Sequence, residues 1–172
     1  MFAERTFAAG ENVIEAGDRV REINFVVTGL ARYYYLTSEG KEFNKSFART
    51  GQVLSSVSSL VSGAPSPFSI QALEPCECLT ISYADLEELC NGYREWEILA
   101  RRLLEQLAIK KERREADFLL LSASERYTKF LDEFADVADR IPNYHIASYL
   151  GITEVALSRI RKRLGFIPVN PG

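Results

Sequence analysis

The residues best placed to do chemistry are mostly polar and basic side chains between positions 153 and 162. Helical spacing over this segment puts six side chains on one outward face: Thr153, Glu154, Val155, Ser158, Arg159 and Lys162. Arg159 can donate two hydrogen bonds to a guanine edge, with Ser158 beside it on the base edges, and Lys162 can bind a phosphate. This chemistry is binding rather than catalysis, and it predicts contacts to double-stranded DNA.

Two short helical patterns position this face, and they meet at Gly151. Ala147 supplies a small residue where the two helices would touch, and the glycine allows the positive φ of a tight turn. Thr153 suits the N-cap of the second helix. The expected inward positions are all apolar: Ile146, Leu150, Ile152, Leu157, Ile160 and Leu164. The spacing predicts a helix-turn-helix with its second helix in the major groove, and an ordinary helical hairpin with a solvated basic face is the alternative.

Charge is distributed unevenly along the chain, whose formal net charge is −3. From residue 142 onward, four basic residues face one acidic residue, Glu154. A cationic face on an acidic body favours phosphate contact at one place and discourages it elsewhere. Tyr144 and His145, at the start of the first helical pattern, are further candidates for phosphate contacts.

The first ninety residues are typical of an all-β domain. Glycines recur mostly every eleven or twelve residues, with β-branched and aromatic runs between them at 23–28, 31–36 and 68–72. Short strands at such regular spacing predict a sandwich or jelly roll. Five aromatic residues are expected in its core, with a ligand pocket as the alternative: Tyr33, Tyr34, Tyr35, Phe47 and Phe68.

A helical pattern without proline or glycine runs from about residue 94 to 121. Its apolar stripe steps by three and four residues through Trp96, Leu99, Leu103 and Leu107. Because a small sandwich cannot bury so long a stripe, we expect it to pair with a second copy, with packing inside the monomer as the alternative. A capping box at 122–125 then starts another helix, which should reach about residue 136.

Other chemistries find little support in the composition. Three cysteines and one histidine form no recognised metal or iron–sulfur spacing, so Cys76, Cys78 and Cys90 are expected to be small buried hydrophobes. No nucleophile–base set and no phosphate-binding glycine loop before a helix is found, so we expect neither an enzyme nor a cofactor or metal. No apolar run approaches membrane-spanning length, which predicts a cytoplasmic protein with no membrane partner.

Taken together, these features resemble the cyclic-AMP receptor protein/FNR superfamily of bacterial transcription regulators. The resemblance covers essentially the whole chain, and its motifs lie at 17–18, 25–32, 123–127, 146–153 and 157–160. Residues 45–47 and 66–70 are similar to a branch common in Bacteroidetes-type bacteria. The resemblance implies an α+β fold with a cyclic-nucleotide-binding-like β-roll (jelly roll) sensor domain at 1–92, a dimerisation helix at 93–121 and a helix-turn-helix DNA-binding domain at 122–172.

The family's cyclic-nucleotide cassette, a Gly-Glu pair plus an Arg followed by Ser or Thr, is only partly matched. Gly51 is present, Gln52 replaces the glutamate, and the arginine position falls near Ser66, with Pro67 after it. No Lys or Arg lies between residues 49 and 94, so the segment lacks the cation that a buried phosphate needs. We expect no cyclic-AMP binding in the family manner, and these four positions remain candidates for binding an unidentified small-molecule effector.

Three other positions depart from the family pattern. Haem and iron–sulfur members use histidine or clustered cysteines in the sensor domain, whereas His145 lies in the helix-turn-helix, where we expect it to face a DNA phosphate or solvent. Pro168 and Pro171 follow Gly165 in a short tail that predicts little or no β-hairpin wing. Many members have a glutamate where Val155 stands, so we expect a binding site that differs from the family's common one.

The resulting hypothesis is a homodimer that binds a palindromic operator, with its two recognition helices about one DNA turn apart. RNA polymerase is a further candidate partner. The alternative is a ligand-binding or protein-interaction module whose DNA-reading element has decayed, which Val155 and the short tail favour.

Overall fold

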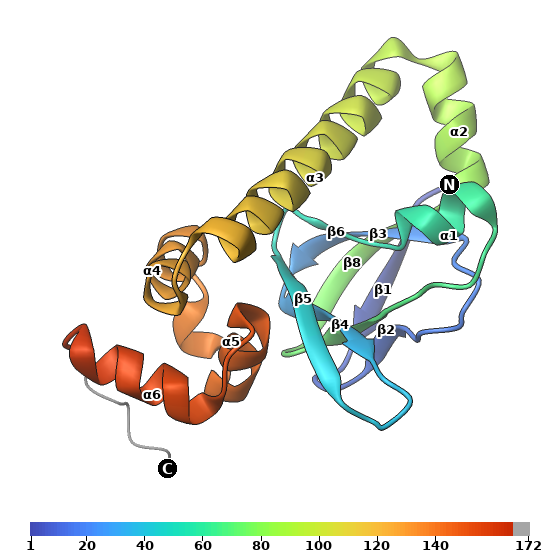
Figure 1. The fold of residues 1–172 in the computed structure, drawn as a ribbon. Coiled ribbons are helices and arrows are strands. Elements are labelled where there is room, and N and C mark those ends of the chain that lie inside the picture. The colour runs from blue at the N-terminus through green and yellow to red at the C-terminus, as the bar shows by residue number, and fades with distance from the viewer. Residues whose placement is uncertain (167–172) are drawn as a thin grey trace. The chain divides into compact units, whose positions relative to one another are not determined.

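The computed structural model describes residues 1–166, which form two compact units (Figure 1). The first unit is Met1–Lys111, and the second begins at Glu112. The boundary lies inside one long helix, α3 (Arg94–Leu120), so this helix contributes to both units and is not a separate part. The domain boundaries expected near residues 93 and 121 stay a prediction. Pro168 and Pro171, on which the prediction about the wing depends, lie outside the described residues.

Two four-stranded antiparallel sheets form the first unit. One sheet has the strand order β1-β8-β3-β6, and the other has the order β2-β7-β4-β5. The strands are β1 (Ala3–Phe7), β2 (Asn12–Ile14), β3 (Glu22–Thr28), β4 (Leu30–Leu36), β5 (Glu42–Arg49), β6 (Val53–Leu54), β7 (Ser69–Ala72) and β8 (Cys76–Ser82). The predicted jelly-roll-like domain is therefore confirmed.

The core of this unit lies between the two sheets. Val26 and Leu54 from one sheet pack with Ala31 and Ile70 from the other, as alternation along the strands requires. Cys76 and Cys78 on β8 are also buried, which confirms their predicted role as small hydrophobes. Burial raises the pKa of the Cys78 thiol to about 11, so this thiol stays protonated at neutral pH. Cys90, by contrast, is only partly buried.

Three helices accompany the roll in residues 1–111. A short helix, α1 (Val57–Ser62), was not predicted, and α2 (Tyr83–Gly92) begins where the sequence changes to a helical period. The side chain of Ser82 caps α2 by accepting from the backbone N–H of Asp85. The chain turns at Tyr93, and α3 then runs for 27 residues and ends one residue before the predicted residue 121. Within residues 1–166 no helix is both long and apolar enough to span a bilayer.

The second unit contains the end of α3 and a set of short helical elements. These are α4 (Ala123–Glu133), the 3-10 helix η1 (Ala138–Arg140), α5 (Asn143–Leu150) and α6 (Glu154–Arg163). The predicted capping box of Ser122 and Glu125 is present at α4. α4 ends before the predicted residue 136, because Phe134 already leaves the helical conformation. The core contains stacked and tilted rings of Tyr127, Phe130 and Tyr149.

Candidate functional site

A tight turn joins α5 to α6. Gly151 adopts a φ of 70°, as the positive-φ prediction required, and its N–H donates to carbonyls of the last turn of α5. The Ile152 N–H reaches back 3.0 Å to the carbonyl of Ala147, which closes the helix end. Thr153 then accepts from the backbone N–H of Ala156 at 3.1 Å, which confirms it as the N-cap of α6.

The two faces of α6 differ as the sequence predicted. Leu157 and Ile160 are buried, together with Leu150 of α5. All six expected outward residues are exposed: Thr153, Glu154, Val155, Ser158, Arg159 and Lys162. The inward prediction was wrong for Leu164, which is 42% exposed, because α6 ends at Arg163 and leaves this side chain beyond the packed turns.

The basic residues of α6 divide into two groups. Arg161 donates to the side chain of Asn143, and Arg163 donates to the hydroxyl of Ser124, so both are used within the second unit. In the part of the chain that the structure describes, neither Arg159 nor Lys162 uses its side chain in a hydrogen bond or ion pair. These two cations are therefore available to a ligand.

Tyr144 and His145 have different environments, although they are neighbours in α5. Tyr144 is 54% exposed, whereas His145 is 5% exposed and lies 4.1 Å from the Tyr144 ring, centroid to centroid. The expectation that His145 faces a phosphate or solvent was wrong, because the helical phase turns this side chain inward with Ile146 and Tyr149. Tyr144 remains a candidate contact.

Two arginines cap the C-terminal end of α5, and the sequence analysis missed both. Arg114 of α3 donates to the carbonyl of Tyr149 at 2.8 Å, and Arg126 of α4 donates to the carbonyl of Leu150 at 3.1 Å. Arg114 also lies over the Tyr149 ring, with 3.9 Å from Cζ to the centroid. Cations at carbonyls of a helix end are stabilising, so these contacts hold α5 in place. Spacing along the chain gives no sign of them, because they join separate helices.

The predicted cassette positions use their donors within the roll. The N–H of Gly51 donates to the carbonyl of Val26 at 2.9 Å, and the N–H of Gln52 donates to the carbonyl of Arg49 at 3.0 Å. Ser66 is buried, and its hydroxyl donates to the carbonyl of Phe68 at 2.8 Å. Pro67 is exposed and has no N–H to offer.

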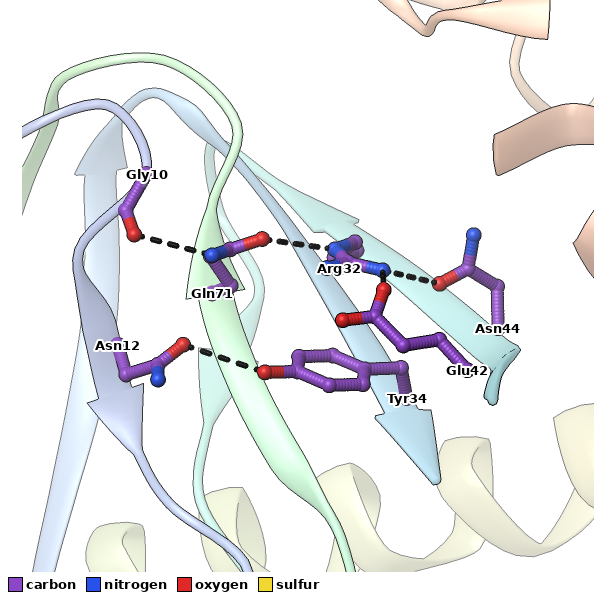
Figure 2. Close-up of polar contacts among 7 residues, drawn as sticks. All are labelled: Gly10, Asn12, Arg32, Tyr34, Glu42, Asn44 and Gln71. Atoms are coloured by element: carbon purple, nitrogen blue, oxygen red, sulfur yellow. Dashed lines mark hydrogen bonds and ion pairs between the residues drawn. The ribbon is translucent and has the colours of Figure 1, made fainter. Parts of the chain in front are cut away.

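A buried arginine on β4 organises the sheet that contains β2, β7, β4 and β5 (Figure 2). Nε of Arg32 donates to Gln71 at 2.9 Å, and Nη1 donates to Glu42 at 2.5 Å and to Asn44 at 3.2 Å. The guanidinium also lies 4.0 Å from the centroid of the Tyr34 ring. These contacts link three adjacent strands, so we assign Arg32 a structural role. Tyr34 is buried, as predicted, and its ring packs against this polar network.

The other four aromatic residues expected in the core also have distinct positions. Phe47 and Phe68 are buried, and Tyr33 is partly buried and packs against the core, which agrees with the prediction. Tyr35 is 43% exposed, so the core prediction was wrong there. It lies near the turn of the β4–β5 hairpin, beyond the part of β4 that pairs with β7.

The stripe on α3 is incompletely covered. No residue of the helix is buried. Trp96, Leu103 and Leu107 are half-buried, and Leu99 is 41% exposed. Trp96 contacts the ring of Phe2, 5.6 Å between centroids. The predicted dimer contact on this helix stays a prediction.

Two packed antiparallel sheets followed by α2 and α3 define a β-roll protein. The chain belongs to the cyclic nucleotide-binding domain family, whose sequence model matches residues 4–93. This match nearly coincides with the sensor domain predicted at 1–92. No curated protein matches the sequence.

Solved structures with a similar fold cover nearly the whole chain. FixK2 from Bradyrhizobium japonicum is 23% identical with a TM-score of 0.80, covering 96% of this chain and 85% of its own. A CooA mutant from Carboxydothermus hydrogenoformans is 18% identical with a TM-score of 0.77, covering 98% and 80%. The catabolite activator protein of Thermus thermophilus is 20% identical with a TM-score of 0.59, covering 99% and 83%. At these identities the comparison shows a shared fold.

Proposed function

We propose that the protein is a dimeric bacterial transcription regulator of the Crp/Fnr type, in the Bacteroidetes-type branch, and that it binds DNA through α6. The observation that carries this proposal is the division of α6 into a buried apolar face and an exposed polar face behind a glycine turn. The fold shared with FixK2 and a catabolite activator protein supports it. It is a binding protein in this proposal, not an enzyme.

Each exposed residue of α6 has a role in this proposal. Arg159 and Ser158 contact base edges, with Arg159 bidentate to a guanine, since its guanidinium has no protein partner in residues 1–166. Lys162, together with Tyr144 of α5, binds phosphates. Val155 is 61% exposed and packs on a thymine methyl, which gives an operator unlike one read by a glutamate at this position.

The second part of the proposal is a homodimer formed through α3. A 27-residue helix with no buried residue leaves apolar area in water at Leu99. Covering that area with the same stripe of a second copy removes it from water. The symmetry of such a dimer matches a palindromic operator.

The third part is that the protein does not bind cyclic AMP in the family manner. The N–H groups of Gly51 and Gln52 and the hydroxyl of Ser66 already donate to carbonyls of the roll. A phosphate at these positions would have to break those bonds without gaining a cation from residues 50–93. Isothermal titration should detect no binding of cyclic AMP at micromolar concentrations, and micromolar affinity would contradict this part.

Selection of bound sequences from random duplex DNA, with purified protein and no added effector, tests the DNA proposal. We expect an enriched palindrome. Arg159→Ala should weaken DNA binding by about 1–3 kcal/mol and relax base specificity at one position of each half-site. Arg101→Ala removes the same charge from α3, where Arg101 pairs with Glu105, and should leave the selected motif unchanged.

Other outcomes of the selection would favour the alternative. If no palindrome is enriched and Arg159→Ala changes nothing, the α6 face does not read DNA under these conditions. The chain would then be a ligand-binding or protein-interaction module with a decayed DNA-reading element.

A further inference from the structure

Two guanidinium groups join the end of α3 to the end of α5 within the second unit. Nη1 of Arg126 donates at 2.7 Å to the carbonyl of Leu121, directly after α3, and Nη2 donates at 3.1 Å to the carbonyl of Leu150. Arg114 of α3 donates at 2.8 Å to the carbonyl of Tyr149, the residue before the last in α5. Three carbonyls at two helix ends therefore share two cations.

One aromatic ring of α3 lies close to both cations. The centroid of the Phe118 ring is 4.8 Å from Cζ of Arg114 and 4.9 Å from Cζ of Arg126. A guanidinium at this distance is attracted to the face of a ring. The same ring approaches the turn after α5, because a Cβ added to Gly151 would lie 2.9 Å from its Cε1. We call Arg114, Phe118 and Arg126 the arginine clamp.

The last turns of α3 are fastened by directed polar contacts more than by burial. No residue of α3 is buried, and Phe118 is itself 41% exposed. The ion pair of Lys129 with Asp117 links α4 to α3, but its lysine side chain is 58% exposed, and exposed pairs contribute little. Hydrogen bonds from a planar guanidinium have a fixed geometry, so the clamp determines the orientation of α5 on α3.

The clamp acts close to the start of α6. Only Gly151 and Ile152 separate Leu150, whose carbonyl the clamp holds, from Thr153, the N-cap of α6. The Ile152 N–H donates back to the carbonyl of Ala147 at 3.0 Å, so the turn is tied to α5 and moves with it. Contacts that orient α5 on α3 therefore orient α6 as well.

We propose that Arg114 and Arg126 are positioning residues for DNA reading, which fix α6 relative to α3 and so determine which spacing of half-sites a dimer can bind. The inference rests on the proposed function, because it requires a dimer through α3 that reads DNA through α6. Neither arginine touches DNA, and Arg159 keeps its role on the base edges. The sequence of a half-site and the spacing of the half-sites then depend on different residues.

Half-site spacing is a sensitive measure of the orientation of α6 on α3. One extra base pair moves the half-sites about 3.4 Å apart and rotates one of them by roughly 35° about the duplex. A rigid dimer cannot follow both changes, so it loses the second half-site and the affinity gained from it. A dimer whose α6 helices can turn relative to α3 accepts both spacings.

Binding of the full-length protein to its selected palindrome, and to the same palindrome with one base pair added or removed at the centre, tests the positioning role. The parent protein should bind each altered palindrome at least about tenfold more weakly in a mobility-shift assay. Arg114→Met and Arg126→Met should reduce this preference to about threefold or less, while the bases selected within each half-site stay the same. Equal weakening at all three spacings would overturn the proposal, because it would show a stabilising role alone.

Two further variants separate the geometry of the clamp from its charge and from stability. Arg113→Met removes the same charge from the neighbouring, exposed position of α3 and should keep the parent's preference. Arg126→Lys keeps the charge but lacks the planar fork, so it should unfold thermally like the parent protein and still lose the preference. It also takes the place of Arg126→Met if that variant does not fold. If Arg126→Lys keeps the parent's preference, the bridge between Leu121 and Leu150 does not position α6.

Amide hydrogen exchange without DNA separates this inference from the proposed function. In Arg126→Met the Ile152 amide should exchange at least about tenfold faster relative to the Leu157 amide, because the end of α5 opens while α6 stays folded. An unchanged Ile152 amide would overturn the clamp whatever the DNA result. If the clamp variants keep the parent's spacing preference, the positioning role is wrong and the regulator stands. If the parent protein selects no palindrome although the Ile152 amide responds, the regulator is wrong and the clamp stands.

Discussion

Gly151 combines two constraints at one residue. Its φ of 70° is a conformation that other residues rarely adopt, and a Cβ at this position would lie 2.9 Å from Cε1 of Phe118. The left-handed conformation alone costs an alanine about 1–2 kcal/mol. The contact with Phe118 adds to that cost, because this ring lies at the end of α3, against the arginine-capped end of α5.

Gly151→Ala should therefore lower the free energy of unfolding of the second unit by more than the backbone cost alone. Gly165 is a matched control in the same unit, since it has a φ of 79° and a Cβ added there would meet no described atom within 4 Å. Gly165→Ala should lower the free energy of unfolding by only about 1–2 kcal/mol. Urea unfolding followed by far-ultraviolet circular dichroism measures both. Equal losses would show that Phe118 moves aside at no cost.

Lys45 makes the stability of the first unit depend on pH. Its folded-state pKa of about 8 lies below the ordinary lysine value of 10.5, so the unfolded chain binds the proton more tightly. Protonated Lys45 therefore destabilises the folded state to its full extent below pH 8, and this destabilisation is lost as the pH rises from 8 through 10.5. Burial of the amine is the main cause of the lowered pKa, and the charge of Lys111 contributes.

Lys45→Met should accordingly raise the free energy of unfolding at pH 7, and the gain should shrink between pH 8 and 10.5. Urea unfolding followed by Trp96 fluorescence, repeated across this range, measures the difference. Lys41→Met is the control, because Lys41 is an exposed lysine near the same hairpin. A gain that stays constant with pH would attribute the effect to the apolar side chain and not to the charge.

The positions of side chains that follow from the spacing within one helix were predictable, whereas contacts between side chains of separate elements were not. The outward face of α6, the Thr153 cap and the positive φ of Gly151 follow from local spacing. The contacts of Arg126 with Leu150 and of Arg114 with Tyr149 join residues far apart in the chain, so no period reveals them. His145 was misplaced because its polarity suggested exposure although its helical phase pointed inward.

Among the elements, the long ones were predicted best. α3 extends to within one residue of the predicted end at 121, because 27 residues without proline or glycine leave no competing structure. α1 has six residues and three serines, which give too short a pattern to recognise. The boundary between the two units at residues 111 and 112 lies inside α3, and a continuous helix carries no sign of where its packing partners change.

The exposed stripe of α3 leads to a prediction about assembly. Leu99→Glu puts a charge into the proposed dimer contact and should raise the dimer dissociation constant at least about tenfold, by sedimentation velocity. Leu104→Glu is the matched control, because Leu104 is 52% exposed on the same helix but lies off the stripe. If both variants remain dimeric, the contact lies elsewhere. If both dissociate, the interface is wider than the stripe.

At the scale of the whole molecule, the net charge of the chain and the symmetry of the proposed dimer together determine how DNA would be bound. The chain has a formal net charge of −3, yet Arg159 and Lys162 of α6 are both exposed. In the proposed DNA-binding role, an acidic body would weaken binding to DNA at random, so a single α6 face should give a modest, salt-dependent affinity. Two α6 faces held in the proposed dimer should give specificity only where the half-sites have the matching spacing.

Operator spacing therefore tests the assembled regulator. In the selected palindrome, the half-site centres should lie about 10 base pairs apart, one helical turn. Inserting about five base pairs between the half-sites turns one of them to the opposite side of the duplex and should abolish tight binding in a mobility-shift assay. Leu99→Glu should bind the intact palindrome no better than a single half-site, because its protomers bind separately. If the insertion has no effect, α6 reads DNA as independent protomers and the stripe of α3 serves another contact.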